Sequence, residues 1–281
     1  MCEFCHQHGE GQKWYLQAKN YADDLLSDLH RRDYINNFLE HPEHSASGIE
    51  KLGMIRTWPG FVQAVVNPYI TYRQKKVHFG QVVPIEECQK IFEFLPSIVR
   101  IACYCRHSTV GNEQRYCYCL STTPGGGQMA EIIRDVDMSY LTGPHTAGLE
   151  LLSGAEALAS FKDHEKEGLC HTVWTFVTPF IGAICNCDRT DCLAMRATVG
   201  YSFPVMFKSE YVAHVDETLC NGCRQCLQAC QFGALSYSAA HRQARVDIRR
   251  CYGCGICRVQ CENRAITLLD RTAVPVAADL W

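Results

Sequence analysis

Two cysteine runs near the end of the chain constrain its structure more than any other feature. Each run has the spacing C-x2-C-x2-C-x3-C, and twenty residues separate them. The first run contains Cys220, Cys223, Cys226 and Cys230, and the second contains Cys251, Cys254, Cys257 and Cys261. This is the spacing of thiolates that hold a [4Fe-4S] cubane, in which four cysteine sulfurs bind the iron atoms. Two runs in tandem predict a compact domain built around two such clusters.

Residues 209–270, which contain both runs, resemble the bacterial ferredoxins with two clusters. The resemblance implies that the first three cysteines of one run share a cluster with the last cysteine of the other. One cubane would then be held by Cys220, Cys223, Cys226 and Cys261, and the other by Cys251, Cys254, Cys257 and Cys230. It also implies a ferredoxin-like domain of ββαβ-type repeats, with short strands over residues 211–215 and 245–248. Crossed ligation joins the two halves, so metal binding contributes much of the folding energy.

The chain departs from these ferredoxins directly after each run, where the family usually has proline and this sequence has Gln231 and Glu262. Because that proline shapes a turn and binds no iron, we expect the fold to persist. From Glu210 onward the chain has eight arginines, no lysine and seven acidic residues. This near balance favours a domain that serves a fixed neighbour over one steered from a distance. We therefore expect a larger redox enzyme or an electron-donor protein as partner, in an arrangement that allows a hetero-oligomer.

The remaining composition bears on location and partners. The first residues lack the basic and apolar regions of a signal peptide, and no apolar stretch is long enough for a membrane span. The nineteen cysteines therefore predict metal ligands in a cytoplasmic protein rather than disulfides. Exposed cubanes degrade in oxygen, which favours an anaerobic cell. The net charge of −3 gives no reason to expect nucleic acid as a partner.

Residues 1–208 are predicted to form a cysteine-rich α/β domain packed on the ferredoxin-like domain, with residues 271–281 as a tail. The whole chain would then be α+β. Apolar periodicity and capping signals predict helices over 14–40, 84–95 and 153–167 and strands over 77–83, 98–105 and 169–177. A break is expected over 41–48, and the Gly-rich residues 123–127 lack a phosphate-binding pattern and are interpreted as a loop. The later two helix–strand units each precede a C-x-C pair, Cys103/Cys105 and Cys185/Cys187, which indicates an internal repeat.

Eleven cysteines lie outside the two runs. Cys88 lies on the apolar face of a predicted helix, and Cys170 stands alone at the start of a predicted strand. Free buried cysteine behaves as a small apolar residue, so both are interpreted as core residues. The other nine lie in groups and are candidate metal ligands, namely Cys2, Cys5, Cys103, Cys105, Cys117, Cys119, Cys185, Cys187 and Cys192.

The clearest of these groups are Cys103-Tyr-Cys105 and Cys117-Tyr-Cys119. In a strand, residues two apart face the same side, so each pair would offer two sulfurs on one face, with Tyr104 and Tyr118 on the other. If the two strands pair, four thiolates converge, enough for a cubane or for tetrahedral Zn²⁺. Arg106 and His107 would stand near enough to hydrogen-bond a cluster sulfur, or would be ordinary surface residues.

Three further sulfurs come from Cys185, Cys187 and Cys192, and Cys2 or Cys5 could complete their site. We expect at least one additional [4Fe-4S] cluster in the N-terminal domain, with Zn²⁺ as the alternative. Cys2-Glu-Phe-Cys5-His6 also fits the haem c attachment pattern. Haem attachment normally follows export, which nothing here predicts, so a cluster or zinc ligand pair is favoured for Cys2 and Cys5.

The N-terminal part loosely resembles the front half of poorly characterised, ferredoxin-tailed iron–sulfur proteins of anaerobes. The resemblance is carried by a helix followed by a C-x-C-R segment, and by Ile-Cys-Asn-Cys at residues 184–187. It implies no particular reaction. Cubanes move electrons without acid–base groups, and no hydrolase, zinc-protease or P-loop pattern is present. The sequence therefore predicts an electron-transfer protein or subunit that passes single low-potential electrons to or from a larger redox enzyme.

Two other functions stay open. The first is a reductase in which the ferredoxin domain feeds an N-terminal cluster with an open iron site. The second is a redox sensor or scaffold that binds zinc or a labile cluster. The catalytic residues of such an enzyme are not predicted by the sequence.

Overall fold

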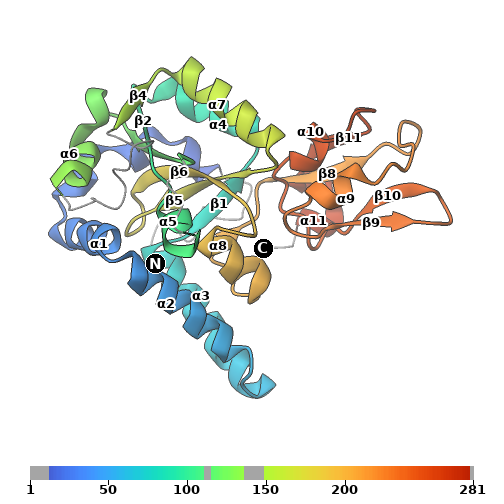
Figure 1. Ribbon diagram of the computed structural model, residues 1–281, viewed down its shortest axis with the longest axis horizontal. Coiled ribbons are helices and arrows are strands. Elements are labelled where there is room, and N and C mark those ends of the chain that lie inside the picture. Colours follow the sequence, from blue (N-terminus) through green and yellow to red (C-terminus); the bar gives the residue numbers. More distant parts are fainter. Residues whose placement is uncertain (1–12, 111–114, 136–148, 279–281) are drawn as a thin grey trace.

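The computed structural model describes residues 13–110, 115–135 and 149–278 (Figure 1). Cys2 and Cys5 lie outside the described residues. A seven-stranded sheet forms the centre of the N-terminal part, in the order β4-β2-β3-β6-β5-β1-β7. Its strands are β1 (Gly80–Val83), β2 (Ser97–Ile101), β3 (Cys117–Ser121), β4 (Glu150–Leu152), β5 (Cys170–Thr175), β6 (Ile181–Cys187) and β7 (Met206–Phe207).

The strands of this sheet pair antiparallel, except that β1 and β7 run parallel. The predicted mixture of helices and strands is therefore confirmed, whereas the expected α/β arrangement of the N-terminal part is not. An α/β fold needs parallel strands joined by crossover helices. Here β2, β3, β6 and β5 are neighbours joined in antiparallel register instead.

Two helices cover one face of the sheet, as Figure 1 shows. They are α4 (Ile85–Phe94) and α7 (Gly154–Lys166), and they pack against each other. Both were predicted, and the capping box between Ser153 and Glu156 is present at the start of α7. Gly168 ends α7 with a φ of 88°, a conformation that favours glycine. Between these helices and the sheet lies an apolar layer that includes Tyr118 and Phe161.

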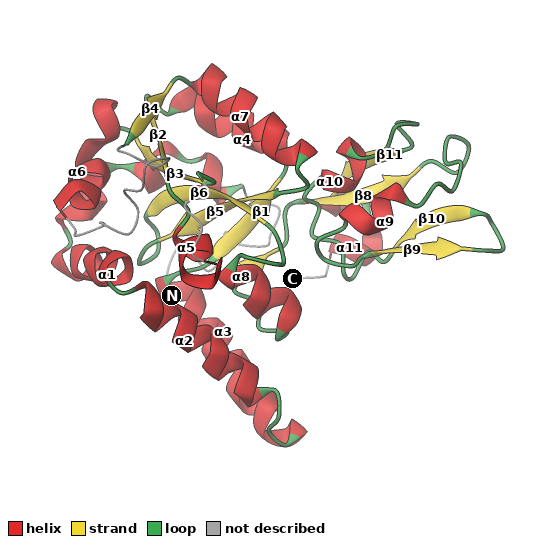
Figure 2. Cartoon of the chain, viewed as in Figure 1, coloured by secondary structure: helices red, strands yellow, loops and turns green. Residues whose placement is uncertain are grey.

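The opposite face is covered by shorter and more varied helices. These are α1 (Leu29–Glu40), α2 (Pro42–Ile55), α5 (Tyr104–Val110), α6 (Gly127–Asp135) and α8 (Leu193–Met195), which continues into a π-helical turn over Arg196–Gly200. A further helix, α3 (Gly60–Val77), extends with the end of α2 away from the body of the protein (Figure 2).

The helical prediction for residues 14–40 is correct only in its second half. Three 3-10 turns, Trp14–Leu16, Ala18–Tyr21 and Asp23–Ser27, precede α1, which begins after its cap Asp28. The predicted break over residues 41–48 is wrong, because α2 starts at Pro42. Proline is well tolerated at a first helical position, where its missing N–H is not needed. The Gly-rich residues 123–127, predicted as a loop, contain a 3-10 turn over Pro124–Gly126 that leads into α6, where Gln128 N donates to the Asp23 carboxylate at 2.8 Å.

The sheet contains an internal repeat around the pairing of β3 with β6. The segment β1-α4-β2-β3 corresponds in order to β4-α7-β5-β6. The first strand of each unit pairs with the second strand of the other, β1 with β5 and β4 with β2. Cys117 pairs with Cys185 at the centre, so the C-x-C pair of β3 corresponds to that of β6. A repeat was predicted, but its match of Cys103/Cys105 with Cys185/Cys187 was wrong, because Cys103 and Cys105 follow β2 and lie outside the sheet.

The C-terminal part has two strand pairs, one short helix within each cysteine run and a third short helix near the end. Strands β8 (Tyr211–Val215) and β11 (Ile266–Asp270) pair antiparallel, as do β9 (Leu235–Ser238) and β10 (Gln243–Val246). The helices are α9 (Gln225–Ala229), α10 (Ile256–Val259) and, near the end, α11 (Pro275–Ala278). Gly253 has a φ of 65°, and a Cβ there would lie 2.0 Å from the Tyr211 carbonyl oxygen. Only glycine fits this approach of the second cysteine run to β8.

The two parts pack directly on each other. Tyr211 of β8 and Lys13 both bind the Glu87 carboxylate of α4, which is fully buried. Arg258 of α10 makes a 2.6 Å ion pair with Glu86. No helix among the described residues is both long and apolar enough to cross a membrane.

Candidate metal centres

The eight cysteines of the two runs lie in and beside α9 and α10. In both halves a backbone N–H donates to the sulfur of the last cysteine, from Ala234 to Cys230 at 3.2 Å and from Ala265 to Cys261 at 3.3 Å. Such hydrogen bonds stabilise a thiolate and tune the potential of a cluster it holds. The two halves therefore make the same hydrogen bond, as their similar cysteine runs lead one to expect.

The two predicted clusters differ in burial. In the first set Cys223 is exposed, and Cys220 and Cys261 are half-buried. In the second set three of the four cysteines are buried, namely Cys251, Cys254 and Cys257. The first set therefore faces solvent, whereas the second lies inside the protein against the N-terminal part.

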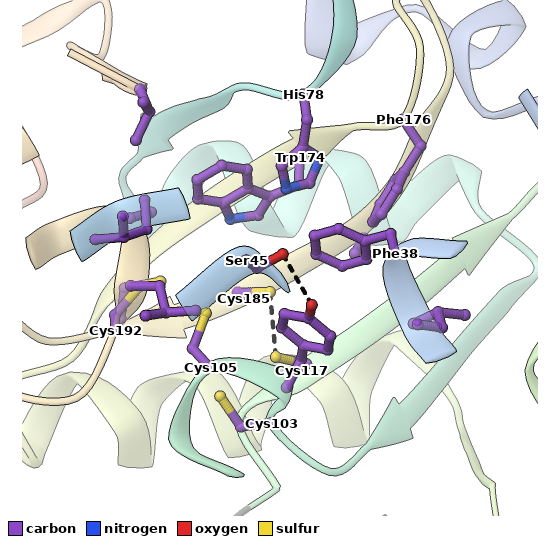
Figure 3. Close-up of a pocket in the computed structure, with 18 of the residues that line it drawn as sticks. Phe38, Ser45, His78, Cys103, Cys105, Cys117, Trp174, Phe176, Cys185 and Cys192 are labelled. Atoms are coloured by element: carbon purple, nitrogen blue, oxygen red, sulfur yellow. Dashed lines mark hydrogen bonds between the residues drawn. The ribbon is translucent and has the colours of Figure 1, made fainter. Parts of the chain in front are cut away.

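Seven of the nine predicted N-terminal ligands line one cavity of about 380 Å³ (Figure 3). They are Cys103, Cys105, Cys117, Cys119, Cys185, Cys187 and Cys192. They come from four segments, which are the end of β2 with α5, strand β3, strand β6 and the turn before α8. The sheet places the β3 and β6 pairs on one face, because Cys117 pairs with Cys185 in register. The other two predicted ligands, Cys2 and Cys5, lie outside the described residues.

Six of these sulfurs form two groups of three. Cys185 Sγ lies 3.3 Å from Cys117 Sγ, and contact with Cys117 raises the pKa of Cys103 more than burial does. In the second group, the thiols of Cys105 and Cys187 hydrogen-bond Cys192 and lower its pKa well below the usual value, while their own pKa values rise. Cys192 is therefore the first of this group to ionise. Metal ligation needs thiolates, so loading would release protons from the other thiols.

Cys119 stands apart from both groups. It is buried on β3, and burial alone raises its pKa to about 12. Its neighbour across the ladder is Ala183 rather than a cysteine. Of the cysteines that line the cavity, Cys119 is thus the least prepared to bind a metal together with another thiol.

The spacing of the sulfurs can be compared with that of a zinc site. Tetrahedral zinc with bonds of about 2.3 Å holds its four sulfurs about 3.8 Å from one another. Among the described residues, no three cysteine sulfurs lie within 4.8 Å of one another. This holds for the C-terminal runs as well as for the cavity, although the pair Cys117 and Cys185 lies at 3.3 Å. The group that does meet the distance is His41, Glu43 and His44, on the surface around the start of α2.

The sequence prediction for the first C-x-C pair was partly wrong. Cys103 and Cys105 do not lie on a strand, because β2 ends at Ile101 and α5 begins at Tyr104. Tyr104 consequently lines the cavity, and its ring stacks on Phe38 with centroids 4.4 Å apart. Tyr118 lies on the opposite face of the sheet from the cavity, as expected, and contacts His164. Tertiary packing of the Tyr104 ring has overridden the local preference of this segment for a strand.

Arg106 is a buried cation at the cysteine end of the cavity. Its guanidinium pairs with Asp188, lies 3.9 Å from Asp191 and donates to Cys103 Sγ at 3.6 Å. It also lies over the Tyr116 ring at 4.1 Å. Nearby thiolates and carboxylates favour its charged form and outweigh the cost of burial. A buried positive charge beside cysteine sulfurs stabilises the additional negative charge of reduction.

The two cysteines predicted as core residues are both fully buried and do not line the cavity. Cys88 lies on α4. Cys170 lies on β5, opposite Cys187, in one apolar layer with Cys192 and Cys254. Its pKa is raised by burial and then by the charges of Cys254 and Cys192. Cys170 thus stands between the cavity and the second C-terminal set.

The sequence did not reveal the remaining wall of the cavity. This wall is aromatic and is formed by Tyr34, Phe38, His78, Tyr104, Trp174 and Phe176. These residues come from distant segments and carry no common motif, so no local signal could have identified them.

Comparison with protein families shows that residues 219–266 match the family model described as a 4Fe-4S dicluster domain. Comparisons with curated proteins and with solved structures found no match. The family match confirms the C-terminal resemblance and supports iron–sulfur electron transfer in general. It does not extend to the N-terminal part, whose resemblance to ferredoxin-tailed proteins is not supported.

Proposed function

We propose that this protein transfers single low-potential electrons between the two C-terminal cubanes and a further iron–sulfur cluster bound by the N-terminal cysteines. The observation that carries the proposal is the convergence of seven cysteines on one cavity beside the ferredoxin-like domain. Iron–sulfur clusters supply one-electron chemistry without acid–base groups. The chain's own contribution is to hold, bury and order the sites.

The N-terminal ligands are drawn from the two groups of three sulfurs around the cavity. A cubane takes four thiolates, so Cys103, Cys117 and Cys185 would be joined by at least one of Cys105, Cys187 and Cys192. The ferredoxin-like domain packed beside these sulfurs favours a cluster over zinc, because a cluster there could exchange electrons with the C-terminal cubanes. The positive charge of Arg106 would stabilise the reduced cluster and so make its reduction potential less negative.

The order of the sites follows from their burial. Cys223, in the first C-terminal set, is exposed, so electrons would enter or leave there. The second set is buried and meets the N-terminal part at Cys254, with Cys170 between it and Cys192. The proposed route therefore runs from the exposed cubane through the buried one to the N-terminal cluster. The partner would be a larger redox enzyme or an electron donor that docks near Cys223.

A second candidate is a reductase in which the N-terminal cluster is the site of reaction. The observation in its favour is that the cavity extends beyond the cysteines to an aromatic wall. A relay that only passes electrons needs no such space next to its last cluster.

The test is the metal content of anaerobically purified protein together with its EPR spectrum after reduction by dithionite. The proposal predicts about twelve iron atoms with matching acid-labile sulfide, and signals from more than two clusters. About eight iron atoms with one zinc would show that the N-terminal cysteines form a zinc site, as in the sensor or scaffold alternative. Co-purification with an oxidoreductase would support the relay, and an EPR change on adding a small molecule would support the reductase.

A further inference from the structure

The cavity has two chemically different ends. In Figure 3 the labelled cysteines gather on one side, and the rings of Phe38, His78, Trp174 and Phe176 gather on the other. Aromatic carbon offers no ligand to iron, so a cluster would be confined to the cysteine end. The aromatic end would therefore remain available to another molecule.

The aromatic rings form a continuous wall. His78 stacks on Trp174 with centroids 5.0 Å apart and lies 4.9 Å from Phe176 and from Phe38. The polar groups of Trp174 and Tyr104 are already occupied, since the indole N–H donates to Thr172 at 2.8 Å and the Tyr104 hydroxyl donates to Ser45 at 2.9 Å. The wall therefore offers flat apolar surface and few polar groups, which is typical of small-molecule sites.

His78 provides one polar atom in this wall. Its Nδ1 lies 2.5 Å from the Thr175 carbonyl oxygen and must donate the hydrogen, because a carbonyl only accepts. Burial lowers the pKa of His78 to about 4, so the ring is neutral at pH 7 and Nε2 carries a lone pair. No described residue hydrogen-bonds Nε2, and His78 lines the cavity. A ligand with an O–H or N–H group would find its acceptor here.

The charged residues that line the cavity and its opening to the surface restrict the kind of ligand further. Arg106 is the only arginine, lysine, aspartate or glutamate among the described residues that line the cavity, and it is paired at the cysteine end. A charged ligand would find no partner at the aromatic end. Gly48 of α2 is exposed and also lines the cavity, and no residue of α2 is buried. The cavity therefore reaches the surface beside α2.

We propose that the aromatic end of the cavity binds a neutral, planar molecule with one aromatic ring and one hydrogen-bond donor, directed at His78 and held beside the N-terminal cysteines. An apolar cavity of about 150 Å³ suffices for benzene, and the whole cavity measures about 380 Å³. A single ring can therefore share the space with a cluster. The inference deepens the proposed function, because a molecule bound here would be the one that meets the N-terminal cluster.

The experiment uses the anaerobically purified, cluster-loaded full chain and two probes of matched shape, p-cresol and toluene, in calorimetric titrations. Both should bind, and p-cresol should bind about fivefold more tightly because its hydroxyl donates to His78. In His78→Phe the preference should disappear while toluene binding changes less than about twofold. His214→Phe, at an exposed position on β8, is the control and should change neither affinity.

The inference is overturned if neither probe binds wild-type protein with full iron content, or if both bind equally and His78→Phe changes nothing. A separate readout addresses the proposed function. The ¹H relaxation of bound p-cresol should be faster in reduced wild-type protein than in reduced Cys117→Ser. If p-cresol binds with the His78 preference but relaxation is equal in both, the binding site stands and the N-terminal cluster is contradicted.

Discussion

The two cysteine-rich regions organise their sulfurs in opposite ways. In the C-terminal part the ligands follow one another within two short runs, and three of the first set are at least partly exposed. In the N-terminal part they come from four separate segments and meet only because β3 and β6 pair at Cys117 and Cys185. A run of cysteines binds its cluster by local spacing, whereas the N-terminal site exists only once the sheet has formed.

The surroundings of the C-terminal and N-terminal sulfurs also differ. Backbone N–H groups donate to the C-terminal sulfurs, and the cavity lined by the second set measures only about 20 Å³. The N-terminal sulfurs face a cavity with an aromatic wall on one side and a buried arginine on the other. The first environment suits a relay, and the second leaves room for a ligand. The predictions below test this difference, from the largest expected effect to the smallest.

Cys254→Ala should have the largest effect, because it removes a ligand of the buried C-terminal cubane. Iron should fall from about twelve to about eight atoms per chain, and the ferredoxin-like domain should unfold more easily since cluster binding is part of its folding energy. Iron analysis and thermal unfolding measure both effects. Cys88→Ala is the control, because Cys88 is also buried but lines neither cavity. Full iron in Cys254→Ala would refute the ligand assignment.

Cys117→Ser and Cys119→Ser should separate ligands from bystanders in the N-terminal part. Cys117 touches Cys185 at 3.3 Å, whereas Cys119 pairs with Ala183. Cys117→Ser should lose about four iron atoms and leave the EPR signals of the C-terminal cubanes intact. Cys119→Ser should keep its iron. Equal loss in both variants would show that the two groups of three sulfurs do not define the site.

Arg106→Met should lower stability by about 3–5 kcal/mol, because it leaves Asp188 and Asp191 without their buried cation. Arg106→Lys keeps the charge and should lose less. Chemical denaturation of the loaded protein measures the difference. Redox titration should also show a more negative potential for the N-terminal cluster alone. An equal shift of all clusters would mean that Arg106 acts through the fold rather than beside the sulfurs.

Mild acid should destabilise the N-terminal part through His164. Burial lowers its pKa to about 4, so its ring is neutral at pH 7. Nδ1 faces the accepting Glu167 carboxylate at 3.5 Å, and Nε2 of the neutral ring then accepts from the Tyr118 hydroxyl at 2.9 Å. Below pH 6.5 the unfolded chain gains a proton that the folded chain does not, so stability falls as the pH drops from 6.5 toward 4. In His164→Gln the midpoint of thermal unfolding should fall less between pH 6.5 and 5. An unchanged pH dependence would exclude His164 as a source of this loss.

Gln231→Pro should have the smallest effect. Gln231 donates to the Gly168 carbonyl at 2.7 Å and accepts from Arg189 N at 3.0 Å, so it joins the ferredoxin-like domain to the N-terminal part. Restoring the proline usual in ferredoxins should cost about 1–2 kcal/mol from these contacts and leave the iron content unchanged. Glu262→Pro, at the corresponding position of the other run, is the control and should cost less. A loss of iron in Gln231→Pro would show that Gln231 supports the cluster itself.

The sequence was sufficient to predict a 4Fe-4S domain in the C-terminal part, because the local spacing of its cysteines is typical of one. The strand at Tyr211–Val215 and the family match at residues 219–266 both agree with that interpretation. The helices α4 and α7 were also predictable, since proline and a capping box mark their starts.

The N-terminal site was predictable only in its residue types. The convergence of Cys117 with Cys185 depends on the pairing of β3 with β6, which no local pattern specifies. The segment around Cys105 has the residues of a strand but forms α5, because Tyr104 packs on Phe38. The aromatic wall had no signal at all, since Trp174 and His78 meet only through the pairing of β5 with β1.

The most direct test of the central claim is the EPR spectrum of fully reduced, anaerobically purified protein, compared with that of Cys117→Ser. Cys254 of the second C-terminal set lies in one apolar layer with Cys170 and Cys192, so clusters bound at the two sites should interact magnetically when both are reduced. The account predicts a broadened spectrum in the wild type and a simpler one, from the two C-terminal cubanes, in Cys117→Ser. Identical spectra and equal iron in the two proteins would contradict it.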